Sequence, residues 1–183
     1  MSDPQSIRRI VLTGFMGAGK STIGPLLAKH LNWDFVDTDN VVESRAGKKV
    51  AQIFAQDGEA AFRAIEAEVI RGCCGREGIV ISLGGGAIET ESTRELLARL
   101  EDTCVVFLDA PLEVLVARCL AQENAEERPV LGDREKLLRR FSSRLAHYRN
   151  AHITVATPEL APDQVVDRIL AEMPGIVPTR ADF

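Results

Sequence analysis

The stretch GFMGAGKST at residues 14–22 constrains the fold more strongly than any other part of the sequence. It contains the complete Walker A pattern, a glycine followed after four residues by Gly-Lys-Ser, between an apolar run and a segment of helical periodicity. In such a loop the backbone N–H groups face phosphate oxygens, Lys20 can contact the β and γ phosphates, and the Ser21 hydroxyl can bind Mg²⁺. A glycine-rich turn without a ligand is the alternative, but every position with a chemical role is filled. We therefore predict a strand, a phosphate-binding loop and a helix, in that order.

Short β-branched runs alternate with segments of helical periodicity along the chain. The expected strands cover residues 7–14, 33–39, 78–86, 103–110 and 152–157. Helices are expected at 20–31, around Arg63, at 93–100, after Pro111, after a polar stretch that follows it, and at 163–173. Strands alternating with helices form a parallel sheet covered on both faces. The expected fold class is therefore α/β, a three-layer αβα arrangement with a central five-stranded parallel sheet, of the P-loop NTPase type.

The chain length bounds the number of domains. A chain of 183 residues can bury a sizeable core, but it is too short for a nucleotide domain plus a separate acceptor domain. We expect one domain over residues 1–183, with any second substrate bound beside the first. The polar segment 121–133 ends in Pro and Gly turn chemistry, and connections of that length are usually functional or mobile. The tail at 174–183 is expected to be frayed.

Composition excludes several classes of protein. A net charge of −5 argues against a nucleic-acid binder, which would normally carry a basic field. No stretch approaches the ~20 apolar residues of a membrane span, and the N-terminal residues resemble no signal peptide, so we expect a cytoplasmic protein without a membrane partner. The four cysteines have no metal-ligand spacing, alone or with the three histidines, and are expected to be reduced thiols: Cys73, Cys74, Cys104 and Cys119.

Three of the expected strands end in chemically useful residues, and ligands of open parallel sheets bind beyond the carboxyl ends of the strands. The first strand leads into the phosphate loop, the second into Asp37-Thr38-Asp39, and the third into Gly84-Gly85-Gly86. In an extended chain Asp37 and Asp39 would share a face, so one could hold water on a metal while the other accepts a hydroxyl proton. A turn with a helix cap is the alternative for the aspartates, and a plain loop is the alternative for the glycines.

The nucleotide and its metal can also be argued from pattern. No asparagine is followed by lysine, so the guanine-reading motif Asn-Lys-x-Asp is absent and ATP is favoured over GTP. A second carboxylate at a strand end is expected to help hold Mg²⁺. Both Asp109, after the apolar run VVFL, and Asp37 remain candidates on pattern alone.

Several arginines are candidates for binding anions. Arg63 lies four residues after Glu59 and three before Glu66, a spacing that also describes a surface ion-pair ladder. Arg128 lies in the polar segment, where it can close over phosphates as an arginine finger does or stay solvated beside neighbouring glutamates. Arg144 follows in an arginine-rich helix for which an exposed face is the default.

Taken together, GFMGAGKSTIG, DTD, FAQDGEAAFRAIE, SLGGGA, ERPVL and RLAHYRNA resemble the shikimate kinases in order and spacing, over about residues 10–155. The resemblance implies a nucleoside-monophosphate-kinase-like P-loop fold with a mobile lid at about 121–133. It implies transfer of the γ-phosphoryl group of ATP to the 3-hydroxyl of shikimate, with Mg²⁺, in aromatic amino-acid biosynthesis. No large apolar helix face demands a partner, so we expect a monomer.

The resemblance also assigns roles to matching positions. ATP is expected at Gly14, Gly17, Ala18, Gly19, Lys20, Ser21, Thr22, Arg118 and Arg128. Shikimate is expected at Asp39, Arg63, Gly84, Gly85, Gly86 and Arg144, with Phe54 and Phe62 as an apolar wall and Glu66 steadying the arginines. Mg²⁺ is expected at Ser21 and, through water, at Asp37, which leaves Asp109 as a strand-end carboxylate. The expected catalytic residues are Lys20, Asp39 and Arg128.

The pattern departs from the family in a few places and leaves two rivals. Ala146 stands where many members have proline, RPVL stands for the common RPLL, and ATPEL lacks an arginine that some members place near adenine. A gluconate-type sugar-acid kinase on the same fold should lack DTD, GGGA and the spacing of Arg63 and Arg144 in combination. A catalytically silent nucleotide-binding module is disfavoured by the intact Lys20, Asp39 and Arg128.

Overall fold

The computed structural model describes residues 6–121, 133–173 and 175. The strands are β1 (Arg9–Thr13), β2 (Asp34–Asp37), β3 (Ile79–Ser82), β4 (Thr103–Asp109) and β5 (Ile153–Ala156). The helices are α1 (Lys20–Leu31), α2 (Thr38–Ala46), α3 (Val50–Gln56), α4 (Gly58–Cys74), the 3₁₀ turn η1 (Ala87–Glu89), α5 (Glu91–Arg99), α6 (Leu112–Leu120), α7 (Arg134–Tyr148) and α8 (Pro162–Glu172).

All of these strands pair in parallel, in the order β2-β3-β1-β4-β5. The central strands β1 and β3 bury every residue, whereas the edge strands β2 and β5 are partly exposed. Central strands of a parallel sheet are apolar because helices cover both of their faces. The predicted five-stranded parallel sheet is therefore confirmed, and the strand order changes direction about β1, where ligands of such sheets bind.

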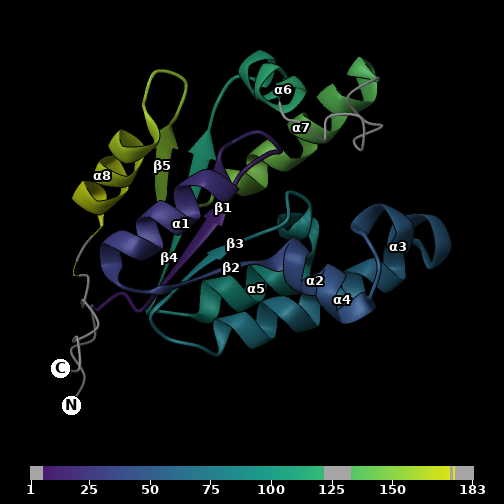
Figure 1. Cartoon of the computed structure of the whole chain (residues 1–183), viewed down its shortest axis with the longest axis horizontal. Coiled ribbons are helices and arrows are strands. Elements are labelled where there is room, and N and C mark those ends of the chain that lie inside the picture. Colours follow the sequence, from purple (N-terminus) through teal and green to yellow (C-terminus); the bar gives the residue numbers. More distant parts are fainter. Residues whose placement is uncertain (1–5, 122–132, 174, 176–183) are drawn as a thin grey trace.

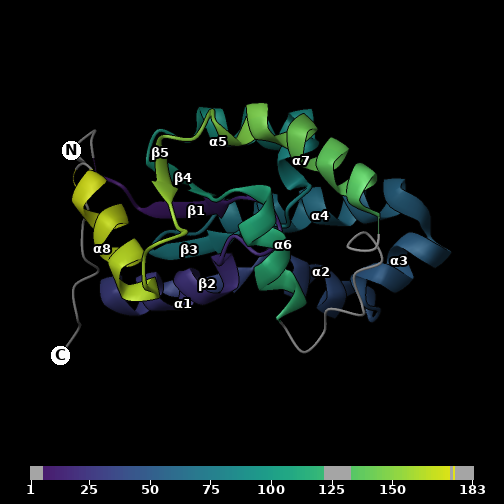
Figure 2. The same ribbon diagram turned by 90° about the horizontal axis from the view of Figure 1, so that it is seen from above.

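Helices lie on both faces of the sheet (Figure 1). Helix α1 contacts β1, β2, β3 and α8. Figure 2 shows α1 and α8 on one side of the sheet and α5 and α7 on the other. The three-layer αβα arrangement is confirmed.

Helix α1 illustrates how the pattern becomes structure. It begins at Lys20, as predicted, after Gly19 with φ 98°, a conformation that favours glycine. Ile23, Leu27 and Leu31, which recur every four residues, are all buried. This apolar stripe fixes α1 against the sheet and so fixes the loop that precedes it.

The predicted second strand is too long. It ends at Asp37, and Thr38 and Asp39 begin α2. The Asp37 carboxylate accepts the backbone N–H of Asp39 at 3.0 Å and so caps the helix, because the first N–H groups of a helix lack a backbone partner. The expectation that Asp37 and Asp39 share one face of an extended chain is therefore wrong, and the helix-cap alternative is correct for Asp37.

The four cysteines are buried, and Cys73, Cys74 and Cys104 are free thiols. Burial raises the pKa of Cys74 and of Cys104 to about 11, so these thiols stay protonated at neutral pH. No helix within the described ranges is both long and apolar enough to cross a membrane. The predicted lid at 121–133 and the predicted tail lie outside the described residues apart from Ala121, Asp133, and Gly175, and Arg128 lies outside them too.

Candidate active site

The phosphate loop connects β1 to α1 and has the backbone that its glycines permit. Gly17 has φ 76°, and a methyl group added there would overlap the backbone carbonyl of Leu115, so this position accepts only glycine. The Lys20 ammonium donates to the carbonyl oxygens of Gly14 at 2.7 Å and Phe15 at 3.2 Å. The loop thus sets a cation beside the N-terminus of a 12-residue helix, and both features attract phosphate.

An oxygen cluster lies beside this loop. Asp37 Oδ2 accepts a hydrogen bond from Ser82 Oγ at 3.0 Å and from Ser21 Oγ at 3.3 Å. The predicted metal residues Ser21 and Asp37 are therefore brought together, and Asp37 serves as helix cap and as their meeting point. Hydroxyl and carboxylate oxygens are hard ligands of the kind that Mg²⁺ prefers, so the donor set fits this ion. Ser82, at the end of β3, belongs to the cluster although no sequence pattern singled it out.

The glycine loop 84–86 brings the predicted acceptor residues together. Each of its glycines lies against a different side chain. A methyl group added to the first would overlap the Asp39 carboxylate, one added to the second would lie 3.7 Å from Arg144 Nη1, and one added to the third would lie 2.5 Å from Arg63 Nη2. Glycine therefore lets the backbone approach the Asp39 carboxylate and the Arg63 guanidinium closely, and the same loop passes Arg144 at an ordinary contact distance.

The two predicted substrate arginines come from different helices and converge. Arg144 Nη2 on α7 lies 2.9 Å from Glu89 Oε2, and Arg63 Nη2 on α4 lies 3.8 Å from the same oxygen. Each guanidinium also lies near an aromatic ring, Arg144 at 5.6 Å from the centroid of Phe15 and Arg63 at 5.3 Å from that of Phe62. One carboxylate oxygen thus marks the point at which both arginines can hold an anion.

Glu66 contacts Arg63 from the buried side of the site. It is 2% exposed and accepts a hydrogen bond from Arg63 Nη1 at 2.7 Å, while Glu59 approaches Arg63 at 3.4 Å from the surface. Burial raises the pKa of Glu66, and the charge and hydrogen bond of Arg63 only partly offset this. Within the described part of the chain, the buried side-chain atoms without a hydrogen-bond partner are Trp33 Nε1, Glu66 Oε1 and Arg144 Nε. Buried polar atoms are normally bonded, so Glu66 and Arg144 each have one atom available to bond a ligand.

Asp39 lies between the phosphate loop and the arginines. Burial, followed by the negative charge of Asp37, raises the pKa of Asp39, while the positive charges of Lys20 and Arg63 act against this rise. The carboxylate therefore lies within the electrostatic reach of the cation of the phosphate loop and of one substrate arginine. A raised pKa at a site of this kind is typical of a group that exchanges a proton.

Two further side chains fix the glycine loop. Tyr148 donates its hydroxyl to the carbonyl of Gly85 at 2.5 Å, and Thr38 Oγ1 accepts the N–H of Gly84 at 3.0 Å. Tyr148 is 1% exposed and its ring stacks on Phe107 at 5.1 Å. Both residues lie inside motifs that the sequence analysis quoted, DTD and RLAHYRNA, but sequence reasoning gave neither of them a role.

The residues predicted for the apolar wall and for adenine have defined neighbours in the structure. The rings of Phe54 and Phe62 lie 4.6 Å apart, and Phe54 is 39% exposed. Arg118 on α6 donates to Thr157 Oγ1 and to the Thr157 carbonyl, both at 2.8 Å. Thr157 follows β5 in the segment ATPEL, which lacks the arginine that some family members place near adenine. In this chain the segment instead holds Arg118 of α6 in place.

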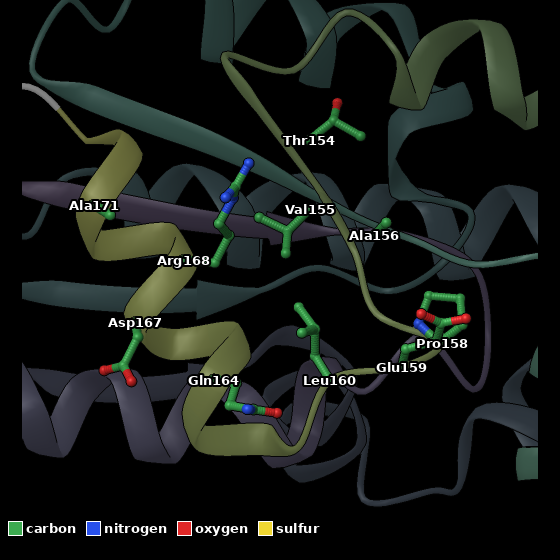
Figure 3. A pocket seen from close by; sticks show the side chains of 10 residues that line it. All are labelled: Thr154, Val155, Ala156, Pro158, Glu159, Leu160, Gln164, Asp167, Arg168 and Ala171. Atoms are coloured by element: carbon green, nitrogen blue, oxygen red, sulfur yellow. The ribbon is translucent and has the colours of Figure 1, made fainter.

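A separate open hollow of about 790 Å³ lies between β5 and α8. Figure 3 shows its lining side chains, which come from β5, the loop after it and α8. The residues that line it are Thr154, Val155, Ala156, Pro158, Glu159, Leu160, Gln164, Asp167, Arg168 and Ala171. It contains none of the predicted site residues, although Ala156, Pro158, Glu159 and Leu160 belong to the segment ATPEL.

A Walker loop on the first strand of this sheet, facing a small polar site with one carboxylate and two arginines, defines a P-loop kinase of small anionic molecules. The family model of shikimate kinase matches residues 16–174, and the chain belongs to the shikimate kinase family. Shikimate kinase from Persephonella marina is 38% identical over 169 residues, which cover 91% of this chain and 99% of that protein.

Solved structures agree with this assignment. The crystal structure of shikimate kinase from Bacteroides thetaiotaomicron has a TM-score of 0.80 and 32% identity, covering 90% of this chain and 97% of that one. Shikimate kinase from Acinetobacter baumannii in complex with shikimate has a TM-score of 0.77 and 33% identity, covering 91% and 92%. The sheet order, the phosphate loop and these similarities confirm the predicted P-loop fold of the nucleoside-monophosphate-kinase type.

Proposed function

We propose that this shikimate kinase transfers the γ-phosphoryl group of ATP to the 3-hydroxyl of shikimate in the space between loop 14–22 and loop 84–86. The products are shikimate 3-phosphate and ADP, in the pathway to aromatic amino acids. The single observation that carries the residue assignment is that three consecutive glycines lie against Asp39, Arg144 and Arg63 in turn. A base for a hydroxyl and two cations for a carboxylate thereby share one small site.

On the donor side, the backbone of residues 14–22 and the Lys20 ammonium would hold the phosphates of ATP. Arg118, fixed by two hydrogen bonds to Thr157, would stack on adenine. Ser21 would bind Mg²⁺ directly and Asp37 would hold one of its waters, as their meeting at 3.3 Å supports. The ion, when bound, would neutralise charge on the β and γ phosphates. Arg128 is proposed as the lid arginine on the resemblance alone.

On the acceptor side, the forks of Arg63 and Arg144 would bind the shikimate carboxylate, since guanidinium groups match that anion bidentately. The backbone of residues 84–86 would contact the ring hydroxyls. Asp39 would accept the proton of the 3-hydroxyl while that oxygen forms its bond to the γ phosphorus and the bond from phosphorus to the β,γ-bridging oxygen breaks. Lys20 would stabilise the charge on the group in transfer.

We also propose that the enzyme acts as a monomer in the cytoplasm. The buried free thiols of Cys73, Cys74 and Cys104 support a reducing compartment. The large exposed apolar side chains of the described residues are Phe54, Leu120 and Leu138, which come from three different helices. Light scattering on the purified protein tests the oligomeric state, and a dimer mass would contradict it.

The activity is tested by a coupled assay of ADP release with ATP, Mg²⁺ and shikimate, with gluconate as the matched alternative acceptor. We expect turnover with shikimate only, loss of turnover when EDTA removes Mg²⁺, and a product phosphorylated at the 3-position by ³¹P NMR. Turnover of gluconate instead of shikimate would indicate the sugar-acid kinase. Binding of ATP without transfer to either acid would indicate the silent module.

A further inference from the structure

Glu89 occupies the position between the two substrate arginines. Its Oε2 lies 2.9 Å from Arg144 Nη2 and 3.8 Å from Arg63 Nη2. The two arginine side chains are only 11% and 20% exposed, so this oxygen lies where little water competes for them. The carboxylate of Glu89 therefore has the place and the charge that the proposed function gives to the carboxylate of shikimate.

The backbone of Glu89 is held by a hydrogen bond, whereas its side chain is partly exposed to solvent. Arg94 Nη1 donates to the carbonyl oxygens of Ile88 at 2.9 Å and of Glu89 at 2.7 Å, which holds the 3₁₀ turn in place. The Glu89 side chain is 35% exposed, and rotation about its own torsions would carry the carboxylate into solvent. The Glu89 carboxylate can therefore leave the two arginines without a change in the fold.

The charges around Arg63 and Arg144 favour replacement of the Glu89 carboxylate by a substrate carboxylate over binding of the substrate carboxylate beside it. Arg63 and Arg144 face two carboxylates, Glu66 and Glu89, and Asp39 is a further carboxylate whose charge acts on Arg63 and Glu66, so the group has no excess positive charge. Glu59 also approaches Arg63, but it is 69% exposed and screened by water. A substrate carboxylate entering beside Glu89 would bring an unbalanced negative charge into a partly buried site. Glu66 is 2% exposed and enclosed, whereas Glu89 is at the surface, so Glu89 is the group that can leave.

We propose that Glu89 is an internal competitor of the substrate carboxylate. It binds both arginines in the free enzyme, rotates into solvent when shikimate binds, and takes no part in phosphoryl transfer. This inference rests on the proposed function and makes Glu89 a positioning residue that sets the affinity for shikimate. A ligand without a carboxylate cannot take its place on the arginines, so the charge of Glu89 should not affect the affinity of such a ligand.

The test is Glu89→Gln, which keeps the shape and removes the charge. A partly exposed ion pair shifts an equilibrium by about two- to fivefold, so we expect KM for shikimate to fall by about that factor. The kcat and the KM for ATP should stay at the wild-type values. Calorimetric titration with shikimate alone should give the same tightening, and the methyl ester of shikimate should bind wild type and variant equally.

Glu91→Gln is the matched control, since it removes the same charge from the exposed first turn of α5. It should leave KM for shikimate unchanged. An unchanged or raised KM in Glu89→Gln, or an equal fall in Glu91→Gln, would overturn the inference while wild-type turnover of shikimate still supported the proposed function. Failure of the wild-type enzyme to phosphorylate shikimate would instead overturn the proposed function, and this inference with it.

Discussion

Asp39→Asn should separate phosphoryl transfer from nucleotide binding. The Asp39 carboxylate lies against the backbone of Gly84, where an amide of the same size also fits, so the change alters chemistry rather than shape. An amide cannot accept the hydroxyl proton, and a positioned base contributes about 10²- to 10⁴-fold in rate. That loss corresponds to roughly 2.7–5.5 kcal/mol of barrier. We expect kcat to fall by about this factor, with the KM for ATP close to that of wild type.

The same substitution should not weaken the fold. Burial, followed by the charge of Asp37, holds the pKa of Asp39 above its ordinary value of 3.8. Ionisation of such a carboxyl costs folding free energy: the cost is absent below 3.8, grows as the pH rises towards the folded pKa, and is complete above it. The asparagine variant escapes this cost, so its unfolding temperature at neutral pH should equal or exceed that of wild type. For the same reason, wild-type activity should fall on acidification at a pH above 3.8.

The assay is coupled ADP release at varied ATP and at varied shikimate, with thermal unfolding measured on the same samples. Asp34→Asn is the matched control, because Asp34 lies at the other end of β2, is 69% exposed and pairs with Arg76. It should leave both kcat and KM unchanged. A variant of Asp39 that lost ATP affinity as much as turnover, or that unfolded several degrees lower at neutral pH, would show that Asp39 is structural and refute the reasoning.

Three other substitutions test the residues that hold the site together. Tyr148→Phe removes the hydrogen bond to the glycine loop and should lower the unfolding temperature by about 2–4 °C and raise KM for shikimate but not for ATP, by calorimetry and steady-state kinetics. Ser82→Ala removes a hydrogen bond to Asp37 and should raise the Mg²⁺ concentration for half-maximal rate, and an unchanged Mg²⁺ titration would contradict the metal role of Asp37. Thr157→Val takes one acceptor from Arg118 and should raise KM for ATP by about three- to tenfold, with KM for shikimate as the internal control.

Most of the fold was predictable because its signals are local. The four-residue spacing of Ile23, Leu27 and Leu31 is enough to place α1, and the apolar runs are enough to place the central strands. The end of β2 was not predictable in this way. The cap that Asp37 forms on α2 ends the strand, and the pattern left it open against an extended chain. The bond from the N–H of Gly84 to Thr38, 46 residues away in the chain, has a partner that no local pattern contains.

The same distinction between local signals and distant partners applies to the candidate site. Residues inside motifs were named in advance, and the structure brings Asp39, Arg63 and Arg144 onto one glycine loop. Residues whose role comes from a distant partner were given no role. Tyr148 lies inside the motif RLAHYRNA, but its bond to a loop 63 residues away is visible only in the folded chain. Glu89 lies on a three-residue turn without any periodicity, so only the folded chain relates it to the site.

Phe15 shows why the two halves of the site act as one. Its carbonyl accepts the Lys20 ammonium at 3.2 Å, and its ring lies 5.6 Å from the guanidinium of Arg144 and edge-on to Phe141 at 5.4 Å. One buried residue of the phosphate loop therefore contacts both Lys20, proposed to hold the donor phosphate, and Arg144, proposed to hold the acceptor carboxylate. Phosphoryl transfer depends on holding the two reacting groups at a fixed separation. In the Walker pattern position 15 accepts any residue, so the coupling of donor and acceptor arises from the packing of α7 against the loop and not from the motif.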